Sequence, residues 1–139
     1  MIQRGEAHSN PNFPYMATSL KSALRQKLPY RINGSLWIEC GSVRFFGPGP
    51  AELLERIDKT GSLRQAAKQM KMSYRKAWQI VSAVNARMAK PVVILHSGGQ
   101  SGGGSSLTPE AKKMLVYHAA LRKRFASFLE KESKKLTSK

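Results

Sequence analysis

Hydrophobic side chains recur at helical spacing through the middle of the chain. Leu53, Leu54 and Ile57 form one apolar stripe, which predicts a helix over residues 50–60 that begins at a proline. Gly61 follows this stripe and is suited to cap the helix, because glycine readily adopts left-handed backbone angles. The pattern therefore predicts a short amphipathic helix that ends at Gly61.

Two further helices are predicted next, joined by a short turn. The first covers residues 62–71 and opens with Ser62 and Gln65, which have the spacing of a capping box. The second begins with Ser73 as its cap and runs to about Met88. The small side chains on the inner face of the first helix allow a crossing helix to approach closely, as a helix–turn–helix requires. The inner-face positions are Leu63, Ala66, Ala67 and Met70 in the first helix, and Ala77, Val81, Val84 and Met88 in the second.

Extended segments are predicted on both sides of these helices. Residues 36–40 and 43–46 are separated by a Gly-Ser pair, which predicts a β-hairpin with a type II′ turn. Residues 92–95 are apolar and mostly β-branched, which predicts a strand. A glycine-rich loop and a short returning strand follow, within residues 97–107. A strand, a loose loop and a returning strand directly after a helix–turn–helix are typical of a wing.

The last predicted helix begins at Thr108, Pro109 and Glu110, which are favourable residues for a helix start, and runs to about Lys131. Apolar residues spaced alternately by three and four predict a heptad seam that is longer than one small domain needs. We expect this seam to pack on a second copy of the chain; packing on its own domain alone is the alternative. The expected dimerisation residues are Met114, His118, Leu121, Phe125 and Phe128.

Both ends of the chain are polar and basic. Residues 1–30 contain several prolines and lack a sustained hydrophobic period, which predicts a disordered basic arm, with a short helix over 17–27 as the alternative. Residues 132–139 predict a basic tail, so that the folded domain covers residues 31–131. The predicted fold is mainly α with small β elements: a winged helix–turn–helix with an N-terminal hairpin, a glycine-rich wing and a long C-terminal helix.

The charge of the chain narrows the choice of partners. Its 24 Lys and Arg residues against 8 Asp and Glu residues give a formal net charge of +16. No acidic residue occurs between Asp58 and Glu110, the stretch that contains the helix–turn–helix and the wing. Such an imbalance indicates nucleic acid, an anionic membrane surface or an acidic protein as the partner. We expect a cytoplasmic protein, because no apolar run is long enough to span a membrane or to serve as an export signal.

The residue patterns of enzymes and metal sites are missing from the sequence. His8, His96 and His118 are far apart and lack cysteine or carboxylate residues at ligand spacing, and Cys40 is the single cysteine. The glycine-rich loop is not followed by the Gly-Lys-Ser/Thr of a nucleotide-binding P-loop. No nucleophile with a plausible base is visible. We therefore expect neither an enzyme nor a bound metal or cofactor.

The outer face of the second helix of the helix–turn–helix suits the major groove of DNA. Arg75 and Gln79 are the best candidates for reading bases, because arginine can grip guanine and glutamine can grip adenine. Contact with phosphates alone is the alternative for both residues. We expect Trp78 to pack between the helix and the wing, with stacking near DNA as the alternative. The expected phosphate contacts are Arg64, Lys68, Lys76, Arg87 and Lys90.

The stretch from Leu53 to about Phe128 resembles the N-terminal DNA-binding domain of the ModE family, the molybdate-responsive regulators. The resemblance rests on Thr60-Gly61-Ser62, on the run from Ser73 to Trp78, and on the glycines of residues 98–104 with Leu107 and Thr108 behind them. It implies a winged helix–turn–helix dimer that binds a two-fold DNA site and regulates transcription. It also implies DNA contacts at Ser62, Arg64, Gln65, Ser73, Tyr74, Arg75, Lys76 and Gln79, and at Gln100 and Ser101 in the wing.

The best-known members of this family continue into molybdate-binding domains, whereas this sequence ends at Lys139. We therefore expect no molybdate site in this chain. The leading hypothesis is a sequence-specific, dimeric transcription factor that binds double-stranded DNA. The alternatives are an architectural protein that coats DNA without sequence preference, and an adaptor that joins other proteins through its long last helix.

Overall fold

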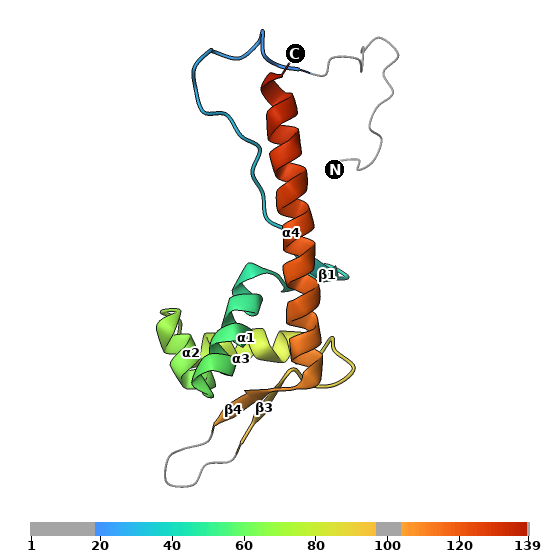
Figure 1. The fold of residues 1–139 in the computed structure, drawn as a ribbon. Helices are drawn as coiled ribbons and strands as arrows, with labels where there is room; N and C mark the ends of the chain where they lie inside the picture. Colours follow the sequence, from blue (N-terminus) through green and yellow to red (C-terminus); the bar gives the residue numbers. More distant parts are fainter. Residues whose placement is uncertain (1–18, 97–103, 139) are drawn as a thin grey trace. The chain divides into compact units, whose positions relative to one another are not determined.

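A computed structural model describes residues 19–96 and 104–138 of the chain. The described residues fall into two compact units, one of residues 35–125 and one of residues 19–34 with 126–138. Two antiparallel two-stranded sheets, β1–β2 and β3–β4, accompany the helices. The elements in chain order (Figure 1) are β1 (Ile38–Cys40), β2 (Val43–Phe46), α1 (Pro48–Thr60), α2 (Leu63–Gln69), α3 (Tyr74–Asn85), β3 (Val93–Leu95), β4 (Ser105–Leu107) and α4 (Pro109–Thr137).

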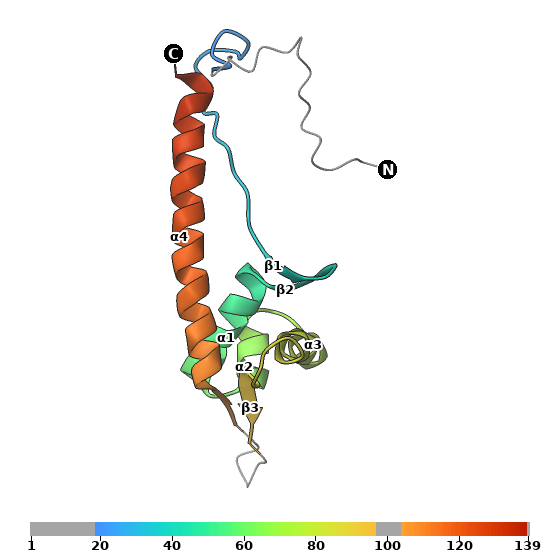
Figure 2. The same cartoon turned by 90° about the vertical axis from the view of Figure 1, so that its right-hand side faces the viewer.

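The core of the larger unit lies where α1, α2 and α3 meet (Figure 2). Strand β2 contributes Phe46 to this core, and the segment before β3 contributes Val92. The helix stripes predicted from the sequence are confirmed for nine of their residues, which are nearly inaccessible to water, whereas Met70 and Met88 are half-buried against the core. The nine buried residues are Leu53, Leu54 and Ile57 in α1, Leu63, Ala66 and Ala67 in α2, and Ala77, Val81 and Val84 in α3.

The helix ends follow the predicted caps. Gly61 has a φ of +69° and donates its N–H to the carbonyl of Ile57 at 2.8 Å, which closes α1. The Ser62 hydroxyl accepts the N–H of Gln65 at 3.0 Å, and the Ser73 hydroxyl accepts the N–H of Lys76 at 3.0 Å. Helix α1 begins two residues earlier than predicted, whereas α2 and α3 each end a few residues earlier.

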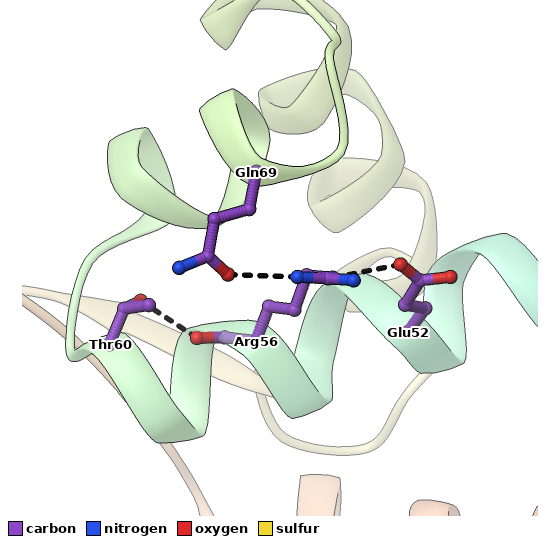
Figure 3. Close-up of polar contacts among 4 residues, drawn as sticks. All are labelled: Glu52, Arg56, Thr60 and Gln69. Carbon is purple, nitrogen blue, oxygen red and sulfur yellow. Dashed lines mark hydrogen bonds and ion pairs between the residues drawn. The ribbon is translucent and has the colours of Figure 1, made fainter.

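A polar network joins α1 to the end of α2 (Figure 3). Arg56 donates from Nε to Glu52 at 2.8 Å and from Nη1 to the side-chain oxygen of Gln69 at 3.0 Å. The Thr60 hydroxyl donates to the Arg56 carbonyl at 2.7 Å, which ties down the last turn of α1. Arg56 thus connects neighbouring turns of α1 and links α1 to the last residue of α2.

The two predicted β elements are present in the described residues. In the hairpin, Cys40 lies opposite Val43, and Gly41 has the positive φ of +62° that such a tight turn requires. In the second sheet, Val93 lies opposite Leu107. The tip of the predicted wing, residues 97–103, lies outside the described residues.

Strand β4 is anchored to the junction of α1 and α2. Ser105 donates its N–H to the Gly61 carbonyl at 2.8 Å, and its buried hydroxyl accepts the N–H of Leu63 at 3.0 Å. Thr108 then caps α4 as predicted: its hydroxyl oxygen accepts the N–H of Ala111 at 3.2 Å. The same hydroxyl donates to the Pro91 carbonyl at 2.7 Å. The second sheet is therefore tied to helices on both of its sides.

The smaller unit joins residues 19–34 of the predicted arm to residues 126–138, whereas residues 1–18 of that arm lie outside the described residues. Helix α4 continues to Thr137, past the predicted end near Lys131. Leu20 donates its N–H to the carbonyl of Leu136 at 2.9 Å. Carbonyls in the last turn of a helix have no partner inside the helix, and this bond satisfies one of them. These contacts between distant parts of the sequence leave no trace in local hydrophobic periodicity. Residues 19–27 form turns rather than the helix considered for this region.

Candidate nucleic-acid interface

A tight, hydrogen-bonded turn joins helices α2 and α3, an arrangement compatible with the predicted helix–turn–helix. Lys71 adopts a left-handed conformation with a φ of +57°, and Met72 donates its N–H to the Ala67 carbonyl at 3.0 Å. On the outside, the guanidinium carbon of Arg64 lies 4.3 Å from the centre of the Tyr74 ring. This cation–π contact links the exposed surfaces of the two helices.

Helix α3 separates a buried face from an exposed one. Ala77, Val81 and Val84 are buried, and successive residues are about 100° apart around the helix axis. Of the other residues of α3, Ile80, Ala83 and Asn85 are half-buried and the rest are exposed; we call the exposed residues the outer face of α3. The outer face carries Tyr74, Arg75, Lys76, Trp78, Gln79 and Ser82. The structure thus brings the predicted base-reading residues together on one surface.

Trp78 corrects one sequence-based prediction. It was expected to pack between the helix and the wing, but 42% of its surface is exposed, close to the 36% of Tyr74 one turn earlier. The core positions of α3 are filled by smaller residues, and Trp78 lies on the outer face next to Tyr74 instead. The helical spacing already places Trp78 on the flank of the face opposite the core, in agreement with its exposure.

The starts of α2 and α3 present uncompensated positive charge. Neither helix has an acidic residue in its first turn, so no carboxylate there offsets the positive end of either helix dipole. The Ser62 and Ser73 hydroxyls accept backbone N–H groups as caps, and their own protons remain free to donate. Arg64 and Gln65 are exposed on the same first turn of α2. This arrangement suits contact with phosphate groups.

Arg87 is less accessible than predicted for a phosphate contact. It is half-buried, and its Nη1 donates to the carbonyl of Ala83 at 3.0 Å. Its buried Nε has no hydrogen-bond partner among the described residues. The side chain therefore stabilises the free carbonyls at the end of α3, a role that basic residues often take. Lys90, by contrast, is exposed.

The β3–β4 sheet contributes exposed residues that were not among the predicted DNA contacts. Ile94 and Leu95 are exposed, and His96 shares a 2.8 Å hydrogen bond between its Nε2 and the Ser106 hydroxyl. The sequence shows no pattern that would single out His96. The predicted DNA contacts Gln100 and Ser101 lie outside the described residues.

The predicted dimerisation residues of α4 differ in exposure. Met114 is half-buried and lines an apolar groove of about 290 Å³ together with Ile38, Met88 and Tyr117. Leu121 and Phe125 are half-buried, whereas 55% of the Phe128 surface is exposed. Apolar surface thus remains accessible along α4.

The His118 side chain is buried within its own chain. It is only 2% exposed, and its ring meets that of Phe46 edge-on with 5.0 Å between the ring centres. Its Nε2 has no hydrogen-bond partner among the described residues. Burial, and next the charge of Arg122, lower the pKa of His118 below its ordinary value of 6.5, while Glu55 acts in the opposite direction. In this structure His118 belongs to the core rather than to an exposed seam.

Metal-binding clusters of His, Cys, Asp or Glu are absent from the part of the chain that the structure describes. Within the same residues, no helix is both long enough and apolar enough to cross a membrane.

Similarity to curated proteins identifies the relatives of this chain, although no protein-family model matches it. It is 39% identical over 84 residues to the molybdenum-pterin-binding protein MopB of Rhodobacter capsulatus, and 35% identical over 88 residues to the transcriptional regulator ModE of Haemophilus influenzae. It is also 32% identical over 77 residues to the DNA-binding transcriptional dual regulator ModE of Escherichia coli K12. Over these aligned residues the chain is similar to proteins of the ModE family.

The alignments cover a larger share of this chain than of its relatives. The three alignments include 60%, 63% and 55% of this chain, but 31%, 34% and 29% of the respective relatives. The chain therefore spans about a third of the length of these ModE-family relatives. Two of the three names describe transcriptional regulators, and none describes an enzyme.

Proposed function

We propose that this chain regulates transcription by binding a two-fold DNA site as a homodimer, with α3 in the major groove. One observation carries the proposal: the outer face of α3 is exposed and basic, whereas its opposite face is fully buried. The helices and strands between Asp58 and Glu110 add no negative charge that would repel DNA. The ModE-family relatives named as transcriptional regulators support the same function.

The exposed residues divide into two roles. Arg75 and Gln79 lie near the middle of the outer face, where each would discriminate between bases by about 1–3 kcal/mol. Arg64 and Lys76 flank them, and with the starts of α2 and α3 they would hold phosphates and set the orientation of the helix. Ser62, Gln65 and Ser73 belong to this second group.

Dimerisation is proposed through α4. Its accessible apolar residues and the adjoining groove at Met114 offer a surface that a second copy would cover. A two-fold dimer would present two copies of α3 to successive major grooves, about 34 Å apart along the duplex. The proposed operator is therefore an inverted repeat.

DNA selection with the purified chain tests this proposal directly. A random library would be enriched over several rounds at physiological salt, with and without molybdate. We expect one inverted-repeat sequence to be enriched, and the comparison of the two selections reports any effect of molybdate on this chain. Equal affinity for enriched and random DNA would reject sequence-specific regulation.

An architectural role is the second candidate, favoured by the net charge of +16. Both roles predict strong dependence on salt, because basic residues release counterions from DNA in either case. The ratio of specific to non-specific affinity separates them. Absence of any DNA binding at low salt would instead favour an adaptor that acts through α4.

A further inference from the structure

A second concave surface lies beside the outer face of α3. It is a groove of about 340 Å³ between the β1–β2 hairpin, the start of α1 and α3, and we call it the hairpin groove. Its apolar lining includes Phe45 and Pro50, which are buried, and Ile80, which is half-buried. This volume is at the small end of the range of about 300–1,000 Å³ that is typical of small-molecule sites.

One wall of the hairpin groove is a tryptophan in a constrained position. Trp37 is half-buried, and its indole lies so close to Gly47 that a Cβ atom at residue 47 would overlap the ring. Only glycine allows this contact between a ring and the backbone. The flat face of the indole therefore rests on the backbone at Gly47 and gives the hairpin groove an aromatic wall.

Two cations lie on opposite walls of the hairpin groove. Arg44 comes from β2 and Lys76 comes from α3, and none of the described residues that line the groove is acidic. Glu39 is the ion-pair partner of Arg44 at 3.4 Å, but both side chains are largely exposed. Exposed pairs of this kind contribute little free energy, so the carboxylate of a ligand can take the place of Glu39.

We propose that the hairpin groove binds a small aromatic carboxylate. The ring of the ligand would pack against Trp37 and Phe45, and its carboxylate would lie between Arg44 and Lys76. Gln79, which also lines the groove, supplies an amide for a further polar substituent. DNA does not match this combination, because its phosphates would leave the apolar lining exposed to water.

Ligand binding would be coupled to DNA binding, a step that rests on the proposed function. Lys76 and Gln79 line the hairpin groove and also belong to the outer face of α3. A bound carboxylate neutralises Lys76 and so weakens the attraction of α3 for phosphates. Linkage then requires DNA to weaken ligand binding by the same factor.

Calorimetry on the full chain without DNA tests the site itself, with 1-naphthoate as the probe. Saturable binding of one naphthoate per chain is expected. The uncharged 1-naphthalenemethanol should bind about tenfold or more weakly, because a charged hydrogen bond is lost. Acetate, which has the charge but no ring, should give no measurable heat. Equal binding of naphthoate and its alcohol, or no binding of naphthoate, would overturn the proposal.

Three variants test whether naphthoate binds in the hairpin groove. Arg44→Met removes a cation from the groove, and Ala83→Leu fills part of its volume. Both should weaken naphthoate binding by about tenfold or more. The control Lys112→Met removes an exposed cation from α4, away from the groove lining, and should bind as the wild type does. Unchanged affinity in Arg44→Met and Ala83→Leu would show that naphthoate binds elsewhere, against the proposal.

The coupling is tested separately, by titrating the selected operator with and without saturating naphthoate. We expect naphthoate to weaken DNA binding by the wild-type chain. It should not change DNA binding by the Arg44→Met variant. Because the calorimetry contains no DNA, a chain that binds naphthoate but no operator would refute the proposed function alone. A chain that binds its operator but not naphthoate would refute only the hairpin-groove site.

Discussion

The side-chain oxygen of Asn85 accepts the backbone N–H of Val92 at 2.7 Å, and this bond joins the last residue of α3 to the segment that enters β3. Val92 is completely buried, so water cannot replace Asn85 as a partner. Asn85→Ala should therefore lower the free energy of unfolding by about 1–3 kcal/mol, measured by urea denaturation. Asn85→Asp retains an acceptor and should lose less. Equal losses in the two variants would contradict the role of this bond.

Arg75 and Lys90 should respond differently to truncation. Arg75 lies on the outer face of α3, so Arg75→Ala should relax the preference for one base pair of the selected operator by about 1–3 kcal/mol. Lys90 is exposed beyond the end of α3, and Lys90→Ala should weaken binding to all sequences about equally. Competition titrations with single-base operator variants measure both effects. A uniform loss in both proteins would reject Arg75 as a base reader.

Trp78 is predicted to contact thymine methyl groups, because its ring is exposed next to Tyr74 on the outer face of α3. Replacing operator thymines one at a time with uracil removes only the methyl group. At one position this exchange should weaken binding of the wild type several-fold, but should not affect Trp78→Ala. Trp78→Phe keeps an apolar ring and should keep part of the sensitivity. Identical uracil effects in wild type and Trp78→Ala would exclude the contact.

The buried His118 should make the folded chain less stable in acid. Burial lowers the pKa of His118 in the folded state below 6.5, so the unfolded chain takes up a proton at higher pH than the folded chain does. The free energy of unfolding should therefore fall as the pH drops below about 6.5, until the folded state is also protonated. His118→Phe should flatten this part of the curve, since other histidines contribute equally to both proteins. Parallel curves for the two proteins would refute the prediction.

The dimer proposal is tested on α4 by sedimentation. Leu121→Glu combined with Phe125→Glu places two charges on the predicted seam and should yield monomers. Ala119→Glu with Ala126→Glu adds the same charges at exposed positions on the other side of the helix, and should leave the mass unchanged. If the seam variant keeps the mass of the wild type, α4 is not the dimer contact.

Local patterns predicted the elements that depend on neighbouring residues. The stripe of Leu53, Leu54 and Ile57, and the caps at Ser62 and Ser73, follow from spacing and hydrogen-bonding chemistry within one or two turns. The boundaries were less accurate, because helix ends depend on which distant groups satisfy the last carbonyls and N–H groups.

The features that sequence analysis missed depend on distant parts of the chain. The bond from Leu20 to Leu136 joins residues at opposite ends of the sequence, and no periodic pattern encodes it. The hairpin groove likewise exists only once β2, α1 and α3 have come together around Trp37. The exposure of Trp78 was open to prediction from its place on the helix, but its size favoured a buried position.

The two hydrogen bonds of Ser105 have a mechanical consequence. They fasten β4 to Gly61 and to the first N–H of α2, and so set the position of the sheet against the start of α2. A duplex that docks against both would meet a preset angle between them. The DNA would then have to deform to fit the protein. Because the stiffness of DNA depends on its sequence, operators that bend easily at uncontacted base pairs would bind more tightly.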